Sequence, residues 1–428
     1  MKKITLLLVL FLCAFTSTAQ VVTTIAGSTA GYTDAVGTSA QFYGPRAVCL
    51  DNNGFMYVAD YTNNLIRKIE IATNTVSTLA GSTAGFADGI GTVAQFNGPS
   101  GICADNNGNL YVTDYFNFKI RKIVIATGEV STYSGSNFGY ANGDLTNALF
   151  NAPVGICREG NFLYITESIN TKIRKIDMIN GTVSTLAGSI QGTIDGIGEA
   201  AQFDGLSGIC TDGNGNLYVA EINNHRIRKI VINTGEVTTF AGSGVPGFNN
   251  GTGITAGFDS PMGLAISNQN YLFVVDYGNN RIRKIDLGTA AVTNFVGAVQ
   301  GYVDGSGAAA RFSEPMGICF DPNGLLYIAD RGNHKIRKVT AVLKAEEFSL
   351  PLSLKIYPNP AVDAVTIETN SNDGNAQLII TDCVGKEVYK QQTTLLSTTV
   401  NTSGLSKGIY FVSLYEGSKS VTQKLIIQ

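Results

Sequence analysis

The sequence contains no tryptophan and only two histidines, His225 and His334, among its 428 residues. The missing tryptophan argues against repeat families whose units are marked by that residue, such as the WD type. The scarcity of histidine leaves little material for a catalytic or metal centre built on imidazole. Only 15% of the residues are charged and the net charge is -3, so nothing in the composition favours a nucleic-acid partner.

Long apolar runs are also scarce, and the one that stands out lies near the N-terminus. Lys2 and Lys3 precede an apolar run over residues 4–15, and small residues lead to a cleavage position between Ala19 and Gln20. This pattern predicts a signal peptide in residues 1–19, because a membrane-spanning helix needs about 20 apolar residues. Cys13 follows the bulky Leu12, which disfavours a lipid attachment site. We expect no transmembrane segment after the signal peptide is removed.

The sequence is rich in repetition. The tripeptide Ile-Arg-Lys starts at residues 66, 120, 173, 227, 282 and 336, always preceded by an asparagine three residues earlier and an acid six residues earlier. The asparagines are Asn63, Asn117, Asn170, Asn224, Asn279 and Asn333, and the acids are Asp60, Asp114, Glu167, Glu221, Asp276 and Asp330. Units of about 54 residues are too small to bury a core alone, so this period indicates a repeat architecture.

Each unit is predicted to form four antiparallel strands joined by turns rich in Asn and Gly. The strands are almost continuously apolar, as expected for sheets covered on both faces. A T-x-x-G motif ends each fourth strand, but its first copy, residues 23–27, stands before any complete unit, and the last unit has none after it. We therefore predict that the N-terminal strand completes the last sheet. The fold class is all-β, a closed six-bladed β-propeller over residues 20–339.

The repeated residues also resemble a known family. NHRIRKI at 224–230 and NHKIRKV at 333–339, together with GICTDGNGNLYVAE at 208–221, are similar to NHL repeats. The resemblance covers about residues 21–343 and implies six-bladed propellers. A phenylalanine ends each long connection between units, and we interpret it as a wedge between blades: Phe42, Phe96, Phe150, Phe203, Phe258 and Phe312.

The period ends at residue 339, and residues 340–353 are interpreted as a linker. Residues 354–428 predict a small antiparallel, Ig-like β-sandwich. They also resemble the C-terminal sorting domain of the type IX secretion system, on the residues Tyr357, Pro358, Asn359, Pro360, Asp382, Gly385, Gly408, Tyr410 and Lys424. That resemblance implies export through the type IX secretion machinery, and a protein secreted by or displayed on a Gram-negative, Bacteroidota-type bacterium. An ordinary accessory sandwich that binds something is the alternative.

Five of the seven cysteines occupy one repeat position: Cys49, Cys103, Cys157, Cys210 and Cys319. Equivalent positions on neighbouring blades should lie about 10 Å apart, whereas a disulfide needs Cα atoms within about 7 Å. We therefore expect small buried side chains rather than disulfides or a metal ring. Cys383, alone in the C-terminal module, is interpreted as a core residue.

Three further patterns have both a chemical and a structural interpretation. His225 and His334 could form a zinc or acid–base site, but they share one repeat position two units apart, which favours a turn residue. The arginines of the Ile-Arg-Lys motif could bind RNA, but each has an acid seven residues earlier, which favours an internal charge pair. The turn at 212–216 resembles part of a calcium loop but lacks the closing glutamate, which favours a hairpin turn.

Residues that differ between units can build a ligand site where identical ones build the ring. At the start of the innermost strand and after the acid of the second strand, the candidates are Arg46, Tyr61, Tyr115, Tyr277 and Arg331. We predict a binding or interaction scaffold whose ligand is an extracellular glycan, peptide or protein. The alternative is an extracellular lyase or hydrolase acting on a glycan, lactone or peptide at the channel mouth. We predict no catalytic residues and no cofactor, and a divalent cation bound in the channel stays open as an alternative.

Overall fold

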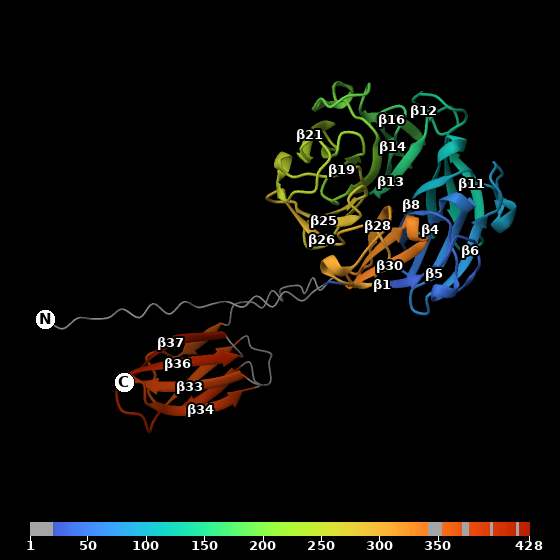
Figure 1. Cartoon of the computed structure of the whole chain (residues 1–428). Coiled ribbons are helices and arrows are strands. Elements are labelled where there is room, and N and C mark those ends of the chain that lie inside the picture. Colours follow the sequence, from blue (N-terminus) through green and yellow to red (C-terminus); the bar gives the residue numbers. More distant parts are fainter. Residues whose placement is uncertain (1–19, 341–352, 370–375, 394–396, 417–418) are drawn as a thin grey trace. The chain divides into compact units, whose positions relative to one another are not determined.

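The computed structural model describes residues 20–340, 353–369, 376–393, 397–416 and 419–428 (Figure 1). These residues fall into two compact units, residues 20–340 and the residues from 353 onward. The predicted signal peptide and residues 341–352 of the predicted linker lie outside the described residues.

The first unit consists of six antiparallel sheets, each of which is one blade. The innermost strands are β3 (Pro45–Leu50), β8 (Pro99–Ala104), β13 (Pro153–Glu159), β18 (Leu206–Thr211), β23 (Pro261–Ile266) and β28 (Pro315–Phe320). The second strands are β4 (Phe55–Asp60), β9 (Asn109–Asp114), β14 (Phe162–Glu167), β19 (Asn216–Glu221), β24 (Tyr271–Asp276) and β29 (Leu326–Asp330). The third strands are β5 (Leu65–Glu70), β10 (Lys119–Val124), β15 (Lys172–Asp177), β20 (Arg226–Val231), β25 (Arg281–Asp286) and β30 (Lys335–Thr340).

The fourth strands of the first five blades are β6 (Thr75–Gly81), β11 (Glu129–Ser134), β16 (Thr182–Ala187), β21 (Glu236–Ala241) and β26 (Ala291–Val296). In the sixth blade this place is taken by the N-terminal strand β1 (Val21–Ala26), which pairs with β30 through Val22↔Val339 and Thr23↔Lys338. Figure 1 shows this strand, in blue, beside the orange strands of the last blade. The innermost strands contact one another in sequence around the ring, and β28 contacts β3. The predicted closed six-bladed propeller is confirmed.

Each blade has one strand more than the sequence predicted. A two-residue strand in the connection entering each blade pairs with the outermost long strand: β2 (Ala35–Val36), β7 (Gly89–Ile90), β12 (Gly143–Asp144), β17 (Gly196–Ile197), β22 (Gly251–Thr252) and β27 (Gly305–Ser306). These strands cover part of an edge that would otherwise expose unpaired backbone groups. Two residues are too few for a periodic pattern, so these strands could not be predicted from the sequence.

Short 3-10 helices complete the unit. Those in the connections are η1 (Gly37–Ser39), η3 (Gly91–Val93), η5 (Gly198–Ala200), η6 (Gly253–Thr255) and η7 (Gly307–Ala309). Those between the second and third strands are η2 (Tyr61–Asn63), η4 (Tyr115–Asn117) and η8 (Arg331–Asn333). The second group places three of the candidate ligand residues at helix starts.

The innermost strands approach each other most closely at a repeated glycine. A Cβ on Gly208 would lie 2.3 Å from the carbonyl oxygen of Met262 in the next blade, a distance that real Cβ atoms do not show. Similar clashes would arise at Gly101, Gly155, Gly263 and Gly317. Blade 1 carries Ala47 at this position instead. The ring around the channel is therefore closed by backbone-to-backbone packing that a side chain would push apart.

Gly208→Ala is expected to lower the free energy of unfolding by about 1–3 kcal/mol, the usual cost of overpacking a tightly packed site. Urea unfolding of the purified propeller would measure it. The matched control is Ala47→Gly, which removes a methyl group at the same repeat position and should cost only about 0.5–1 kcal/mol through backbone entropy. Equal stability of Gly208→Ala and the parent protein would contradict the packing argument.

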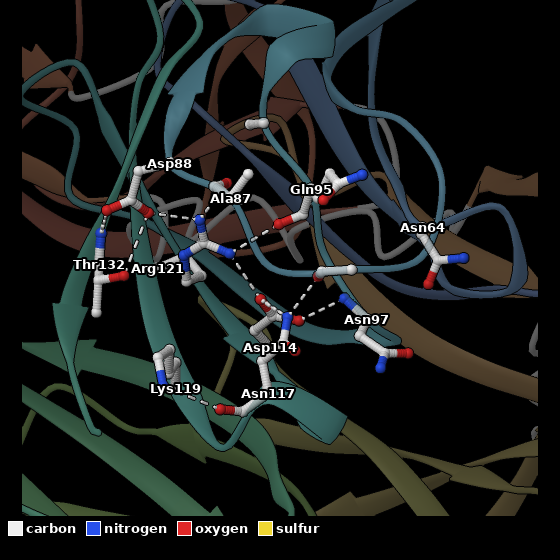
Figure 2. Close-up of polar contacts among 12 residues, drawn as sticks. Asn64, Ala87, Asp88, Gln95, Asn97, Asp114, Asn117, Lys119, Arg121 and Thr132 are labelled. Atoms are coloured by element: carbon white, nitrogen blue, oxygen red, sulfur yellow. Dashed lines mark hydrogen bonds and ion pairs between the residues drawn. The ribbon is translucent and has the colours of Figure 1, made fainter. Parts of the chain in front are cut away.

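The repeated arginine ties the connection of each blade to its second and third strands. Figure 2 shows Arg121 between two carboxylates, with its Nη1 2.7 Å from Asp114 and its Nη2 2.6 Å from Asp88. It also donates to the carbonyl oxygens of Gln95 and Ala87, at 2.9 and 2.8 Å. The side chains of Arg67, Arg121, Arg174, Arg228, Arg283 and Arg337 are all fully buried. The predicted charge pair is confirmed, and these arginines supply no basic surface for nucleic acid.

The acid and the asparagine of the motif complete this junction. In blade 1, Asp60 accepts hydrogen bonds from Asn63, Arg67 and the backbone N–H of Tyr43. Asn63 also donates to the carbonyl oxygen of Gly31, at 2.6 Å. Burial raises the pKa of Asp60 to about 6, because loss of hydration outweighs these hydrogen bonds. The repeated acid, Asn and Arg thus hold the loops of one face in place through buried hydrogen bonds and ion pairs.

The phenylalanine at the end of each connection lies between two blades, as predicted. Phe96 is fully buried in a cluster that includes Ile66 and Ala80 of blade 1 and Val112 of blade 2. It packs beside Gly81 of the T-x-x-G motif, whose φ is +103° and on which a Cβ would lie only 2.4 Å from the carbonyl oxygen of Asn64, so no side chain fits there. The guanidinium carbon of Arg121 lies 5.1 Å from the ring centre, so the wedge and the buried charge pair form one junction.

The second unit is a two-sheet sandwich. One sheet has the order β31 (Leu354–Tyr357), β32 (Ala364–Thr369) and β35 (Ser397–Asn401), and the other β34 (Glu387–Thr393), β33 (Ala376–Asp382), β36 (Gly408–Glu416) and β37 (Lys419–Ile427). Its core is a single cluster of alternate residues from both sheets, such as Val365, Leu378 and Val412. The predicted small β-sandwich is confirmed.

Candidate functional site

The turn between the second and third strands lies on the same face as the end of the connection from the preceding blade. The backbone N–H of Thr62 donates to the carbonyl oxygen of Tyr43, and that of Phe116 donates to the carbonyl oxygen of Asn97. These bonds hold the start of the innermost strand beside the turn residue. The two sets of variable positions found in the sequence therefore meet at one mouth of the channel.

The first part of this mouth is an arginine between two tyrosines. The guanidinium carbon of Arg46 lies 4.9 Å from the ring centre of Tyr61 in its own blade and 5.6 Å from that of Tyr115 in the next. All three residues are half-buried. Burial lowers the pKa of Arg46, and the nearby charge of Arg331 lowers it too, while the two tyrosines act in the opposite direction. Among the described residues no carboxylate forms an ion pair with Arg46, so its charge faces the channel mouth uncompensated.

The second part is an ion pair with a tyrosine. Arg331 Nη1 lies 2.5 Å from a carboxylate oxygen of Glu314, and both side chains are partly exposed. Tyr277 of blade 5 is near the same Glu314, and burial together with the charge of that carboxylate raises the pKa of Tyr277. The structure thus places all five predicted residues along an arc of four consecutive blades, 5, 6, 1 and 2.

Glu314 is the residue of this arc that the sequence argument missed. It occupies a left-handed backbone position, φ +50°, where the other blades have the small residues Gly44, Gly98, Ala152, Gly205 and Ser260. A glutamate is unusual in that conformation. The same rule that selected the other candidates, a residue that breaks the repeat, would have selected Glu314 if it had been applied one position before the innermost strand.

The rest of the mouth is less polar. The channel has a volume of about 100 Å³ and is lined by the residues that start the innermost strands, Arg46, Ser100, Val154, Ser207, Met262 and Met316. The hydroxyl oxygen of Ser100 is buried without a hydrogen-bond partner, whereas that of Ser207 lies 3.7 Å from the sulfur of Met262. Ser168 and Ile222 occupy the outer positions of blades 3 and 4. This small volume places any sizeable ligand at the mouth rather than inside the channel.

The histidines are turn residues, as predicted. His225 and His334 have left-handed backbones, and their Nδ1 atoms accept hydrogen bonds from the backbone N–H groups of Ser260 and Gly44 in the next blade, at 3.0 and 3.2 Å. In two other blades Asn64 and Asn280 accept the equivalent bond through a side-chain oxygen. This position therefore joins adjacent blades, which explains why Asn and His exchange there.

The repeated cysteines are free thiols, buried at Cys157 and Cys210 and half-buried at Cys49, Cys103 and Cys319. Burial raises the pKa of Cys103 to about 12. The prediction for Cys383 was wrong, because its side chain is exposed. It follows the end of β33, in the turn closed by the hydrogen bond from the Gly385 N–H to the Asp382 carbonyl oxygen.

The aspartate turns are hairpin turns, as predicted. In the 212–216 turn, Asp212 Oδ1 accepts the backbone N–H groups of Asn214 and Asn216, at 2.8 and 3.1 Å. The same pattern recurs at Asp51, Asp105 and Asp321. In the described part of the chain, no group of three or more His, Cys, Asp or Glu side chains is arranged to hold a metal ion.

The motif residues of the second unit hold its last strand in place. Asn359 donates to the carbonyl oxygen of Lys424 and accepts the N–H of Ile426, at 2.7 and 2.9 Å. Tyr410 is buried and donates to the carbonyl oxygen of Ser406, at 2.9 Å. Tyr357 is hydrogen-bonded to Glu368 on the neighbouring strand. Of the predicted signal-cleavage pair, Ala19 lies outside the described residues, and the carbonyl oxygen of Gln20 accepts the N–H of Gly307.

The fold and the mouth define a six-bladed propeller with a variable face. Its sequence matches the NHL repeat at residues 96–123 and 312–339, and the secretion system C-terminal sorting domain at residues 355–428. The chain is an NHL-repeat propeller protein with a type IX secretion sorting domain. That domain marks it as a secreted or cell-surface protein of a Bacteroidota-type bacterium and implies interaction with the secretion machinery. Within the described ranges no helix is long and apolar enough to cross a membrane.

Several known proteins are similar to this chain in sequence or in fold. NHL repeat-containing protein 2 of Gallus gallus is 31% identical over 58% of this chain and 39% of its own length. A probable peptidyl-alpha-hydroxyglycine alpha-amidating lyase of Caenorhabditis elegans is 24% identical over 59% of this chain and 73% of its own. The crystal structure of an auxiliary nutrient binding protein from Bacteroides thetaiotaomicron superposes with a TM-score of 0.59 at 18% identity, over 75% of this chain and 76% of that one. The chain spans about two fifths of the length of the first relative, and the structural likeness concerns the fold alone.

Proposed function

We propose that the propeller is an exported binding module that captures a carboxylate-bearing glycan at the channel mouth. The observation that carries this proposal is Arg46, whose guanidinium lies between the rings of Tyr61 and Tyr115 without an ion-pair partner. A half-buried cation without a counter-charge favours an anionic ligand. Arg331 is less suited to bind an anion, because the carboxylate of Glu314 already neutralises its charge.

The chemistry of the mouth favours a uronate over a peptide. The planar guanidinium matches a carboxylate in two parallel hydrogen bonds, and the exposed Phe116 beside Tyr61 and Tyr115 adds apolar surface for a sugar ring. A peptide would need backbone partners, but the N–H groups of Gly44 and Gly98 at this mouth are already bonded to His334 and Asn64. Side-chain recognition of an acidic sugar therefore fits the available groups.

A lyase or hydrolase at the same mouth is the second candidate. Its specific support is the nearness of Glu314 to Tyr277, whose pKa is raised by burial and by that carboxylate, since a carboxylate and a phenol close together are groups that can transfer a proton to or from a substrate. A lyase is also among the similar sequences, the probable amidating lyase of Caenorhabditis elegans. Appearance of shortened or unsaturated products from a bound glycan would favour this candidate.

Arg46→Gln is expected to weaken binding of trigalacturonate by about tenfold to a hundredfold, the range for losing hydrogen bonds to a charged group. Isothermal titration with the purified propeller would measure it, and raising the salt concentration should weaken binding to the parent protein. Ile222→Ala, on the far side of the same mouth, is the matched control and should bind as the parent does. A neutral galactose trimer should bind much less well. Equal affinity of the Arg46→Gln and parent proteins for trigalacturonate would overturn the proposal.

A further inference from the structure

The first residue of the third strand is basic in five blades and apolar in one. The basic residues are Lys119, Lys172, Arg226, Arg281 and Lys335, and blade 1 has Leu65. Lys335 donates to the carbonyl oxygen of Ser28 at 2.6 Å and lies 4.5 Å from the ring centre of Tyr302. Arg281 likewise donates to the carbonyl oxygen of Ala298 at 2.9 Å and lies over the ring of Phe248. The cation thus bridges a loop carbonyl and an aromatic ring.

The same arrangement recurs in blades 2 and 3. Lys172 donates to the carbonyl oxygen of Ser189 at 3.1 Å and lies 4.6 Å from the ring centre of Tyr140. Lys119 donates to the carbonyl oxygen of Ser136 and lies 4.7 Å from the ring centre of Phe86. In four blades, therefore, a basic side chain is held in the same way: its charged group donates to a loop carbonyl oxygen and lies over an aromatic ring.

Blade 1 retains the aromatic ring and the loop carbonyl oxygen of this arrangement but lacks the basic side chain. Tyr32 occupies the aromatic position, and it is 72% exposed, against 42–62% for its aromatic counterparts Phe86, Tyr140, Phe248 and Tyr302. The carbonyl oxygen of Ser82 corresponds to that of Ser28 and accepts no hydrogen bond among those found in the described residues. A cleft of about 740 Å³ lies here, lined by Tyr32, Asp34, Asn63, Leu65 and Ser82.

A comparison with blade 3 shows what is special about this cleft. A hollow of about 650 Å³ at the equivalent place in blade 3 is lined by Tyr140, Lys172 and Ser189, so there the cation is already supplied by the chain. In blade 1 the wall includes Leu65 in its place, and the Asp34 carboxylate at its edge is 46% exposed. The apolar side chain, the carboxylate and the free carbonyl oxygen complement a positively charged group on an alkyl stem.

We propose that the blade 1 cleft binds a lysine side chain of a partner polypeptide, which enters where Lys119, Lys172 and Lys335 lie in their own blades. The ammonium group would stack on Tyr32 and donate to the Ser82 carbonyl oxygen, and its methylene stem would pack on Leu65. The guanidinium of Arg67, bonded to Asp34, opposes a second cation, so a single lysine binds weakly and a partner gains affinity from further contacts. This site is separate from the channel mouth and does not rest on the proposed glycan binding.

The test is a titration of the purified full-length protein, followed by NMR, with a capped pentapeptide Gly-Gly-Lys-Gly-Gly. Binding in the millimolar range is expected, together with shifts of Tyr32 signals. Leu65→Lys, which restores the residue of the other blades, should abolish the binding, whereas the uncharged control Leu65→Met should preserve it. Tyr32→Ala should weaken it at least several-fold.

Three results would overturn the proposal. The peptide with an acetylated lysine could bind as well as the free lysine, Leu65→Lys could bind as well as the parent protein, or Tyr32→Ala could leave binding unchanged. Tighter binding of butylammonium than of the peptide, on a molar basis, would overturn the polypeptide as the occupant in favour of small amines. A melting temperature of Leu65→Lys at or above that of the parent would show that loss of binding reflects a filled cleft and not misfolding.

Discussion

Arg121→Met is expected to lower the free energy of unfolding of the propeller by about 3–5 kcal/mol, the cost of breaking a buried ion pair from one side. The methionine keeps much of the volume but leaves Asp114, fully buried, without its cation. It also leaves the carbonyl oxygen of Gln95 without its guanidinium donor, and that of Ala87 with only the N–H of Gln95. Urea unfolding, followed by circular dichroism, would measure the loss.

The repeat itself provides the control. Asp88, the second carboxylate on Arg121, is 47% exposed, and blades 3 and 5 carry Asn142 and Asn250 at that position, each 3.0 Å from the arginine. Asp88→Asn should therefore cost no more than about 1 kcal/mol, as for a partly exposed pair. Adding Asp114→Leu to Arg121→Met should recover part of the stability, because it removes the unpaired charge. If Arg121→Met and Asp88→Asn proved equally mild, the buried pair would not be a source of stability.

Phe96→Ala is expected to destabilise the propeller by about 3–5 kcal/mol, the range for deleting a buried aromatic side chain and leaving a cavity. The ring is fully buried and touches both blades that it separates, so its loss weakens the contact between blades as well as the core of one blade. Arg121 would also lose the ring beneath its guanidinium. The change in melting temperature and in the urea midpoint would measure the effect.

Phe86→Ala is the matched control for this substitution. Phe86 belongs to the same connection and also lies near Arg121, 5.0 Å from its guanidinium carbon, but it is 50% exposed. Its removal should cost about 0.5–1 kcal/mol, the usual value of an exposed cation–π contact. Equal destabilisation by the two alanine variants would show that the position of Phe96 between the blades has no special weight.

Much of the architecture could be predicted from the sequence because the same unit recurs six times. The spacing of Ile-Arg-Lys determined the number of blades, and the isolated T-x-x-G motif at residues 23–27 predicted that β1 closes the last blade. The pairing of Asp114 with Arg121 followed from their constant separation. When the same residues recur at the same spacing in six units, a chance match is excluded, and the local structure can be predicted from the pattern.

The sequence failed where a single copy or a very short segment decides the structure. The two-residue edge strands have no period of their own, and Cys383 was assigned to a core although it lies in a turn. Glu314 was missed because it stands one position before the two sets of variable residues, and its contact with Arg331 is seen only in the fold. Leu65 was not among the predicted site residues, because an apolar residue is ordinary in a strand, although the other five blades carry a lysine or an arginine at its position.

The sequence by itself therefore determined the repeat, the ring closure and the export route, all of which depend on periodic patterns or on a contiguous motif. The tertiary structure alone decided which of the variable residues meet. Arg46 and Tyr115 come from different blades, as do Tyr277 and Glu314, and the members of each pair lie close only because neighbouring blades pack against each other. The physical reason is that a propeller brings together residues of neighbouring blades that are far apart in the chain, and their side-chain directions depend on the packing of whole blades rather than on neighbours in the chain.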